Sequence, residues 1–329
     1  MKRPLEGIRV LDLTQAYSGP FCTMNLADHG AEVIKIEVPN LGDQTRTWGP
    51  IYNGCSGYYS YVNRNKKGMT LNLKSEEGKK IFTELLKTAD VVCENYKVGV
   101  LEKLGFSYEA MREINPRIIY ANITGFGLQG PLAQRPCYDI VAQAMGGMMD
   151  VTGFAGGLPT KVGPAIADNY TGALLAIGIL MALYKRERTG EGGHVDVAMV
   201  DTMIHILDHF IIDYTILGEK HSRSGNNDQS IAPFDSFAAK DGMFVLACGT
   251  DGMFAKLCGL MERPDLLEDA RYATNYDRCC NYAALKPEIE RWSTTRTVDE
   301  LEEAILAIGI PFGRIQDVEQ VVKNPQTTA

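Results

Sequence analysis

The first half of the chain alternates short apolar runs with amphipathic segments. The apolar and β-branched runs predict strands at residues 8–13, 31–37, 69–73, 89–95 and 117–124. The segments between them carry helix start and stop signals and predict helices at residues 20–29, 75–88 and 107–115. This alternation predicts an α/β fold with a Rossmann-like, doubly wound parallel sheet, whose functional loops follow the carboxyl ends of the strands.

The longest apolar stretch, residues 169–184, contains no charged side chain. Asp168 precedes it, and basic residues and Gly190 follow it, so the stretch predicts a buried helix that is too short to cross a membrane. Asp168 is then either the N-cap of this helix or a carboxylate nucleophile of lowered pKa, beside N–H groups that can hold an oxyanion. The local sequence is compatible with both roles.

Residues 199–217 predict one long helix with several acidic and histidine side chains. His205 and His209 are four residues apart, a spacing that metal ligands use, but the chain has no H-E-x-x-H motif. We therefore interpret these side chains as the polar face of an amphipathic helix and predict no metal site.

The sequence changes character near Gly218. Polar residues 219–228 predict a linker, and the region after it has a hairpin turn at Asp241-Gly242 and a capping box from Thr297 to Glu300. This pattern predicts a smaller α+β domain. The predicted organisation is a large domain over residues 1–217, a linker over 218–232, a small domain over 233–315 and the start of a returning segment over 316–329.

Composition narrows the class of protein. The 329 residues are 45% hydrophobic and 22% charged with a net charge of −8, which is typical of a globular protein and argues against general nucleic-acid binding. The first residues lack the apolar region of a secretory signal, and the eight cysteines show no C-x-x-C spacing. We therefore expect a cytoplasmic protein with free thiols and no membrane partner.

Two motifs are candidate phosphate sites. Residues 63–68, Asn-Arg-Asn-Lys-Lys-Gly, place three cations in four positions and suit either a phosphate group or a solvated turn. Residues 125–130 match the dinucleotide-binding pattern G-x-G-x-x-G, but Pro131 and Pro136 leave no helix after it. A nicotinamide dehydrogenase is therefore not favoured, and a failure to bind NAD would exclude it.

A set of motifs along the whole chain resembles the family III CoA-transferases, which include formyl-CoA transferase and carnitine CoA-transferase. The matching motifs are Pro4-Leu-x-Gly-Ile-x-Val-Leu-Asp-Leu13, Gly30-Ala-Glu-Val-Ile-Lys-Ile-Glu37, Asn63-Arg-Asn-Lys-Lys67 with Leu71-Asn-Leu-Lys74, Glu94-Asn95, Tyr138-Asp-Ile-Val-Ala-Gln143, Ile166-Ala-Asp168-x-x-Thr-Gly172 and Thr189-Gly-x-Gly-x-x-Val-Asp-Val197. The resemblance implies a large domain built from both chain ends, a smaller domain between them, and a homodimer of two interlocked subunits.

The resemblance also implies the site and the chemistry. Asp168 matches the family's nucleophile, which attacks an acyl-CoA thioester to form a mixed anhydride. The released CoA thiolate then forms an aspartyl-CoA thioester, and a small carboxylic or carnitine-like acid finally takes the CoA. Coenzyme A is thus a substrate, and no further cofactor is expected. The residues that match the family's CoA contacts are Tyr17, Ser18, Leu71, Asn72, Leu73, Lys74, Asn95, Tyr96, Lys97, Lys103, Tyr138 and Asp139.

Some positions depart from the family pattern. Residue 17 is Tyr where formyl-CoA transferase has Gln, and residue 38 is Val where it has Arg, so we expect the adenine end of CoA to be held differently. Residues 226–235 lack the glycine-rich run of formyl-CoA transferase, so oxalate and formate are not assigned as substrates. Relatives continue beyond residue 329, which suggests a truncated chain.

Two other functions remain open. α-Methylacyl-CoA racemase resembles the same family, but its catalytic histidine corresponds to Tyr138 here and its glycine run to residues 169–171. Exchange of the α-deuteron of an acyl-CoA in the absence of an acceptor acid would support the racemase. A non-catalytic CoA-binding protein is the other alternative, and it predicts saturable CoA binding without a covalent intermediate.

Overall fold

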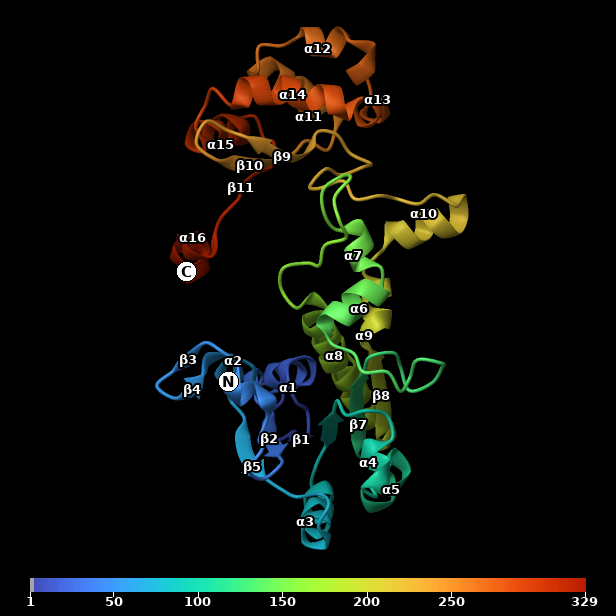
Figure 1. Ribbon diagram of the computed structural model, residues 1–329. Helices are drawn as coiled ribbons and strands as arrows, with labels where there is room; N and C mark the ends of the chain where they lie inside the picture. Colours follow the sequence, from blue (N-terminus) through green and yellow to red (C-terminus); the bar gives the residue numbers. More distant parts are fainter. Residues whose placement is uncertain (1–2) are drawn as a thin grey trace. The chain divides into compact units, whose positions relative to one another are not determined.

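A computed structural model describes residues 3–329, which form two compact units (Figure 1). Unit 1 comprises the chain up to Thr152 together with residues 159–221, and unit 2 comprises residues 153–158 and 222–329. The short segment 153–158 therefore packs with the second half of the chain, although it lies within the large domain predicted from the sequence. Each unit is described separately.

Unit 1 is built on a six-stranded sheet in which every pairing is parallel, as the sequence predicts. The order is β5-β2-β1-β6-β7-β8, which is the 3-2-1-4-5-6 order of a doubly wound fold. The strands are β1 (Arg9–Asp12), β2 (Glu32–Glu37), β5 (Lys67–Thr70), β6 (Val91–Glu94), β7 (Ile119–Thr124) and β8 (Gly193–Ala198).

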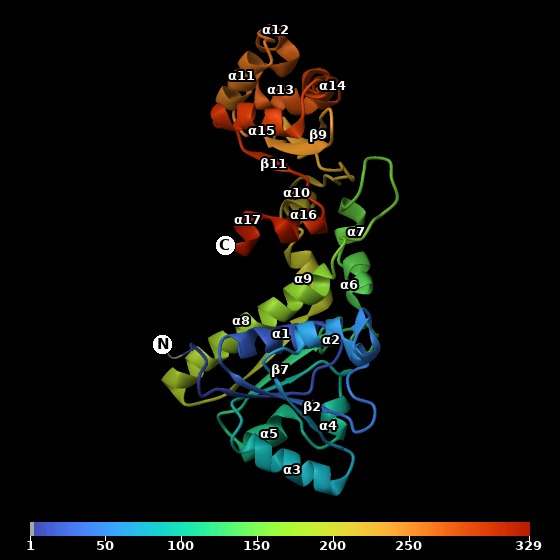
Figure 2. The same cartoon turned by 90° about the vertical axis from the view of Figure 1, so that its left-hand side faces the viewer.

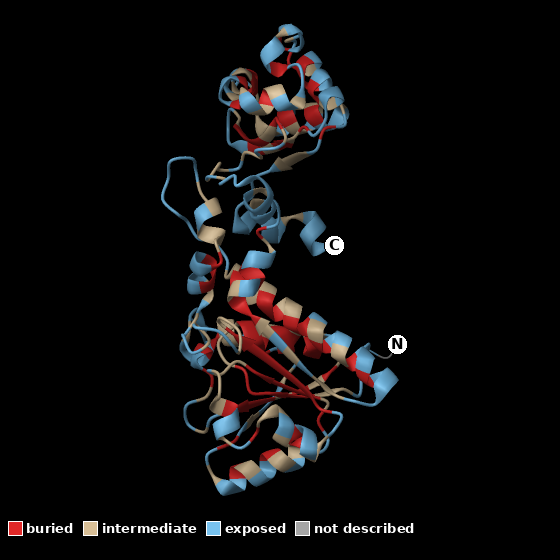
Figure 3. Cartoon of the chain, turned by 90° about the vertical axis from the view of Figure 1, so that its right-hand side faces the viewer, coloured by how far each residue is buried: buried red, intermediate tan, exposed pale blue. Residues whose placement is uncertain are grey.

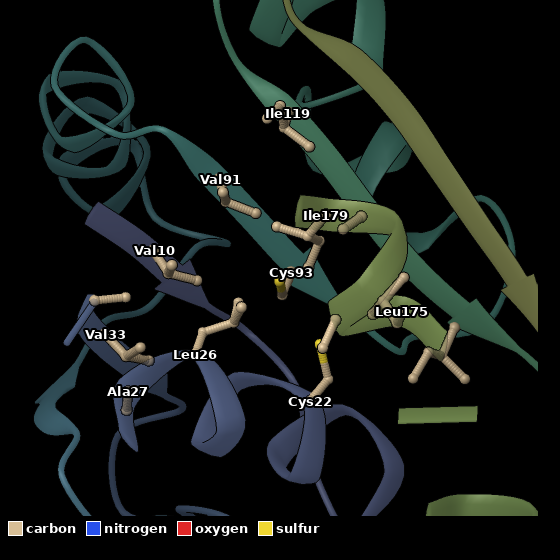
Figure 4. Close-up of a cluster of buried hydrophobic side chains, with 14 of the residues drawn as sticks. Val10, Cys22, Leu26, Ala27, Val33, Val91, Cys93, Ile119, Leu175 and Ile179 are labelled. Atoms are coloured by element: carbon tan, nitrogen blue, oxygen red, sulfur yellow. The ribbon is translucent and has the colours of Figure 1, made fainter. Parts of the chain in front are cut away.

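Helices cover both faces of this sheet (Figure 2). Helices α1 (Ser18–Asp28) and α8 (Ile166–Thr189) lie on one face, and α3 (Glu76–Leu86) and α5 (Tyr108–Ile114) lie on the other. Alternate strand residues therefore enter different cores: Val10 packs with α1 and α8, as Figure 4 shows, while Leu11 packs with α3 and α5. Burial on both faces explains why the strands read as nearly continuous apolar runs.

Helix α8 is long and apolar enough to cross a membrane by length and composition alone. In the described residues it packs on α1, β7 and β8, and it carries buried as well as exposed positions (Figure 3). Leu175 and Ile179 are fully buried there (Figure 4). One face of α8 is therefore part of the core of unit 1, as its charge-free stretch predicts, whereas the prediction that the helix is too short to cross a membrane is wrong, because it runs over 24 residues.

Two predictions for unit 1 are wrong. The helix predicted over 199–217 is broken at Asp208, whose φ of 35° lies outside the helical region. Its two halves carry His205 and His209 on different helices, and residues 3–329 contain no group of side chains suited to a metal. Residues 38–62, predicted as loop, contain short elements.

The remaining elements of unit 1 are a 3₁₀ helix (Gln44–Thr47), β3 (Ile51–Tyr52), β4 (Cys55–Ser56), α2 (Gly57–Val62), α4 (Val100–Lys103), α6 (Asp139–Met145), α7 (Met148–Val151), α9 (Met199–His205) and α10 (His209–Leu217).

Unit 2 has a small antiparallel sheet of order β11-β10-β9 and its own apolar core. The turn at Asp241-Gly242 and the capping box between Thr297 and Glu300 are confirmed. The elements are β9 (Phe234–Ala238), β10 (Met243–Ala247), β11 (Phe312–Arg314), α11 (Asp251–Leu260), α12 (Asp265–Glu268), a 3₁₀ helix (Ala270–Tyr272), α13 (Asn275–Cys280), α14 (Tyr282–Ser293), α15 (Val298–Ala307), α16 (Val318–Lys323) and α17 (Pro325–Thr328).

Candidate active site

A cavity of about 430 Å³ lies in unit 1 at the carboxyl ends of the parallel strands. The loops after β1, β6 and β7 line it, and Asp168 joins them from the start of α8. Strands β1 and β6 are neighbours at the point where the order of the sheet reverses, which is where doubly wound folds bind their ligands. The charged residues that line the cavity are Lys97, Arg135 and Asp168.

Asp168 lies in the first turn of α8 but is not its N-cap, so that prediction is wrong. The N-cap position is Ala165, which has no side chain to cap the helix. The carboxylate of Asp139, from α6, takes this role: its Oδ1 accepts hydrogen bonds from the N–H groups of Ala167 at 2.8 Å and Asp168 at 3.3 Å. The cap therefore comes from a residue 29 positions earlier in the chain.

The start of α8 has few N–H groups left for an oxyanion. Ile166 donates to Pro164 O and Asn169 donates to Ala165 O, while Asp139 accepts from the two residues between them. The prediction that these N–H groups hold a tetrahedral oxyanion is therefore not supported, because their hydrogen bonds are already made within the protein.

The pKa of Asp168 is raised to about 7, whereas the helix N-terminus alone predicts a lowered value. Burial is the main cause because it disfavours the charged form, and the negative charge of Asp139 adds to it. A hydrogen bond with the Ser18 hydroxyl acts in the opposite direction. Both protonation states of Asp168 are thus populated near neutral pH.

The loop after β1 brings Tyr17 and Ser18 to the cavity, and buried ion pairs hold it in place. Lys66 pairs with Asp12 at 3.0 Å and Lys35 pairs with Asp43 at 2.9 Å, each with side chains no more than 2% exposed. The Asp12 carboxylate accepts a hydrogen bond from the N–H of Thr14, and Lys35 donates one to the carbonyl oxygen of Thr14. Buried charged side chains therefore fix the backbone at the beginning of the loop.

The three basic side chains of residues 63–68 form ion pairs with carboxylates of the protein. Arg64 pairs with Asp28, Lys66 with Asp12, and Lys67 with Glu32. Lys66 is also buried and donates to the carbonyl of Pro20. The structure therefore favours a structural role for this segment over the binding of a phosphate group.

The loop after β6 places Asn95, Tyr96 and Lys97 at the cavity. The side-chain amide of Asn95 makes two 2.8 Å hydrogen bonds with the backbone N–H and carbonyl of Gln15, which tie this loop to the one after β1. Lys97 is exposed, and it makes no ion pair with another residue of the range 3–329. It is thus available to an anionic ligand.

Of the other predicted CoA contacts, Tyr138 lines the cavity, while Asp139 caps α8 instead. A second group lies away from the cavity lining. Leu71 and Leu73 are buried in the core on the α3 face, and Lys103 is exposed at the end of α4. The predicted residues outside the cavity lining are Leu71, Asn72, Leu73, Lys74, Lys103 and Asp139.

Sequence reasoning missed an aromatic wall of the cavity. Trp48 and Tyr58 come from the segment after β2, and the Tyr58 ring lies 5.3 Å from the rings of both Trp48 and Tyr17. Arg135, from the loop after β7, was also missed; it is exposed and makes no ion pair within residues 3–329. The richness of residues 38–62 in Tyr, Gly and Pro was the signal available for the aromatic wall.

A sequence model of CoA-transferase family III matches residues 5–329. Acetyl-CoA:oxalate CoA-transferase of Acetobacter aceti is 44% identical over 100% of this chain and 85% of its own length. The succinyl-CoA:mesaconate enzyme of Haloarcula marismortui is 42% identical over 98% and 82%, and the human succinyl-CoA:glutarate CoA-transferase is 41% identical over 98% and 74%. A CaiB/BaiF family protein from Brucella suis has the same fold, with a TM-score of 0.89 at 41% identity over 100% of this chain and 88% of its own.

Proposed function

Because this chain belongs to the family III CoA-transferases, we propose that it transfers coenzyme A from an acyl-CoA to a free acid through covalent intermediates on Asp168. The observation that carries this proposal is the position of Asp168. It is the single carboxylate among the described residues that line the cavity at the reversal point of the sheet. A carboxylate there is half-buried and basic enough to act as a nucleophile near neutral pH.

The proposed reaction exchanges groups of similar energy. An oxygen of Asp168 attacks the thioester carbon, the C–S bond breaks, and CoA leaves as a thiolate with a mixed anhydride on Asp168. The thiolate attacks the aspartyl carbonyl carbon and the donor acid leaves as a carboxylate. The acceptor carboxylate then attacks the aspartyl carbonyl carbon of the thioester, which expels the CoA thiolate and leaves a second mixed anhydride. The thiolate attacks the acceptor carbonyl carbon, the anhydride C–O bond breaks, and Asp168 is released as a carboxylate. Each step regenerates one anion, so no external base is required.

The residues around Asp168 support binding of an anionic ester. Lys97 and Arg135 line the cavity without a carboxylate partner among the described residues and suit phosphate or carboxylate oxygens. Tyr17 and Tyr138 supply ring surface for the pantetheine chain and the acyl group. These residues are proposed contacts of the substrates.

We propose that the acceptor is a small dicarboxylic acid. The relatives named above are enzymes of oxalate, mesaconate and glutarate, which all carry two carboxylates. One carboxylate of such an acid reacts at Asp168 and the second requires a cation, which Lys97 or Arg135 can provide.

The test is direct chemical trapping of Asp168. The protein is incubated with a panel of acyl-CoAs and hydroxylamine, and the peptide that contains Asp168 is analysed by mass spectrometry. We expect a hydroxamate at Asp168. In a separate transfer assay without hydroxylamine, we expect dicarboxylic acids to accept CoA faster than monocarboxylic acids of equal length. CoA binding without modification of Asp168 would contradict the proposal, and equal use of both acid types would contradict the dicarboxylate assignment.

We also propose that the chain acts as a homodimer. Unit 1 exposes large apolar side chains on α8 and α10, and single chains rarely leave such faces open to water. The exposed side chains are Ile177, Leu180, Met181, Tyr184, Ile211, Ile212, Tyr214, Ile216 and Leu217.

Sedimentation equilibrium should give the mass of two chains, and replacement of Met181 by glutamate on α8 should shift the equilibrium toward one. Met181 is 67% exposed in the single chain, so the charge should leave the packing of unit 1 intact and weaken the proposed interface with a second copy. Replacement of exposed Glu77 on α3 by glutamine is the control and should leave the mass unchanged. The mass of one chain for the unmodified protein at micromolar concentration would refute the dimer.

A further inference from the structure

The side chains of Asp139 and Gln143 lie at i and i+4 on α6 and form one connected group with the start of α8. Gln143 donates from Nε2 to Asp139 Oδ2 at 2.7 Å, and its Oε1 accepts the N–H of Val162 at 2.8 Å. Asp139 Oδ1 accepts the N–H groups of Ala167 and Asp168. The pair therefore binds both the segment that leads into α8 and the first turn that carries Asp168.

We propose that Asp139 and Gln143 are positioning residues for the nucleophile, and that the charge of Asp139 controls the pH at which Asp168 reacts. This inference rests on the proposed function of Asp168. It replaces the expectation that Asp139 contacts CoA, because both carboxylate oxygens of Asp139 are already hydrogen-bonded within the protein.

The geometry makes the pair necessary for a rigid first turn. Ala165 at the N-cap position cannot satisfy the N–H groups of the helix, so the cap must come from another element. Gln143 is fully buried and keeps the Asp139 carboxylate in one orientation. Without the pair, the turn that carries Asp168 would lose the contacts that define its position, and small displacements of a reacting group slow an enzyme strongly.

The two negative charges also influence each other. Burial raises the pKa of Asp168 first, and the nearby carboxylate of Asp139 raises it further, while Ser18 stabilises the ionised form. A more basic carboxylate is a better nucleophile once ionised, but a smaller fraction of it is ionised at low pH. The acid limb is the pH range over which the rate rises as Asp168 becomes ionised. The charge of Asp139 thus moves the acid limb to higher pH.

Other titratable and charged groups face Asp168 and are not substituted in the test, although the charge of Asp139 also contributes to the raised pKa values of Tyr58 and Cys137. Tyr17, Tyr58 and Cys137 lie close enough that the charge of Asp168 contributes to their own raised pKa values. Lys97 and Arg135 line the same cavity.

The experiment measures the rate at which hydroxylamine traps acylated Asp168, from pH 5 to 9, in three variants. Asp139→Asn removes the charge and keeps an oxygen that can accept the helix N–H groups. We expect its acid limb to move down by about one pH unit. Its plateau should also fall, because an amide oxygen kept on the helix N–H groups leaves the Nδ2 donor facing the Nε2 donor of Gln143. Gln143→Met keeps the charge and removes the hydrogen bonds, and we expect its plateau to fall about 10- to 100-fold without a shift of the limb. Glu77→Gln removes a distant exposed charge and should change neither.

The outcomes separate the alternatives. An unshifted limb in Asp139→Asn, with a raised KM for the acyl-CoA, would show that Asp139 contacts the substrate and would overturn the inference. An unchanged plateau in folded Gln143→Met, checked by its thermal transition, would overturn the positioning role. The absence of trapping in the unmodified protein would instead refute the proposed function of Asp168.

Discussion

Replacing Asp168 with alanine is expected to reduce CoA transfer by at least about 10⁴-fold, because the carboxylate that forms the covalent bond is removed. Binding of the acyl-CoA should persist, since the other groups that line the cavity are unchanged. The side chain is half-buried and pairs with no cation of residues 3–329, so its loss leaves no uncompensated positive charge among them. Transfer is measured by chromatography of the CoA esters and binding by calorimetry.

Two further variants make this result specific. Asp168→Asn retains the shape of the side chain and should be as inactive as the alanine variant, because an amide does not attack a thioester. Asp201→Asn on α9 removes an exposed carboxylate outside the cavity lining and should retain activity. If Asp168→Ala kept measurable turnover with an intact fold, a covalent aspartyl route would be wrong and direct transfer between substrates would be required.

Replacing Lys66 with methionine is expected to lower the free energy of unfolding by about 3–5 kcal/mol, because it leaves the Asp12 carboxylate buried without its partner. Lys66 Nζ contacts Asp12, the carbonyl of Pro20 and the amide oxygen of Asn63, each at 2.9–3.0 Å. Urea denaturation followed by circular dichroism measures the change. Pro20 and Ser18 lie in the first turn of α1, and Tyr17 directly precedes it, so we also expect transfer to fall in this variant.

Lys67 provides a matched control on the next residue. It pairs with Glu32 on the surface, where its side chain is 73% exposed, so Lys67→Met should cost less than about 1 kcal/mol. The double replacement of Asp12 by asparagine and Lys66 by methionine should be more stable than Lys66→Met alone, because no unpaired charge is then buried. A stability of Lys66→Met within experimental error of the unmodified protein would contradict a buried ion pair at this position.

The buried ion pair between Asp12 and Lys66 predicts how the stability of the fold depends on pH. Burial raises the pKa of Asp12, but the charges of Lys66 and Lys35 and hydrogen bonds from two threonines outweigh burial and lower it to about 2. Ionised Asp12 therefore stabilises the fold above the ordinary pKa of an aspartate, and this contribution is lost as the pH falls from about 4 to about 2. The loss should be smaller in the double replacement, which has no carboxylate at position 12.

The sequence by itself determined the main regular elements of unit 1 and their order, although the edge strand β8 and the short elements were not predicted. Apolar runs and helix signals depend on neighbours along the chain, so the parallel sheet and the helices α1, α3, α5 and α8 could be predicted with bounds off by a few residues. Where a local signal failed, a backbone feature had intervened: the apolar pattern of residues 199–217 continues through Asp208, but the chain turns there. A hydrophobic pattern does not record such a break.

The tertiary structure alone decided the partners of the charged groups. Asp168 was recognisable as a special position at the start of a charge-free helix. Its pKa nevertheless rises, because the surrounding protein buries it and because the carboxylate of Asp139, 29 residues away in sequence, lies beside it. The lysines of residues 63–68 resembled a phosphate site, yet the side chain of Lys66 is buried and paired with Asp12 at the end of β1. Burial and charge are interactions through space, whose energy depends on distance and on exclusion of water, and neither quantity is written in the local order of residues.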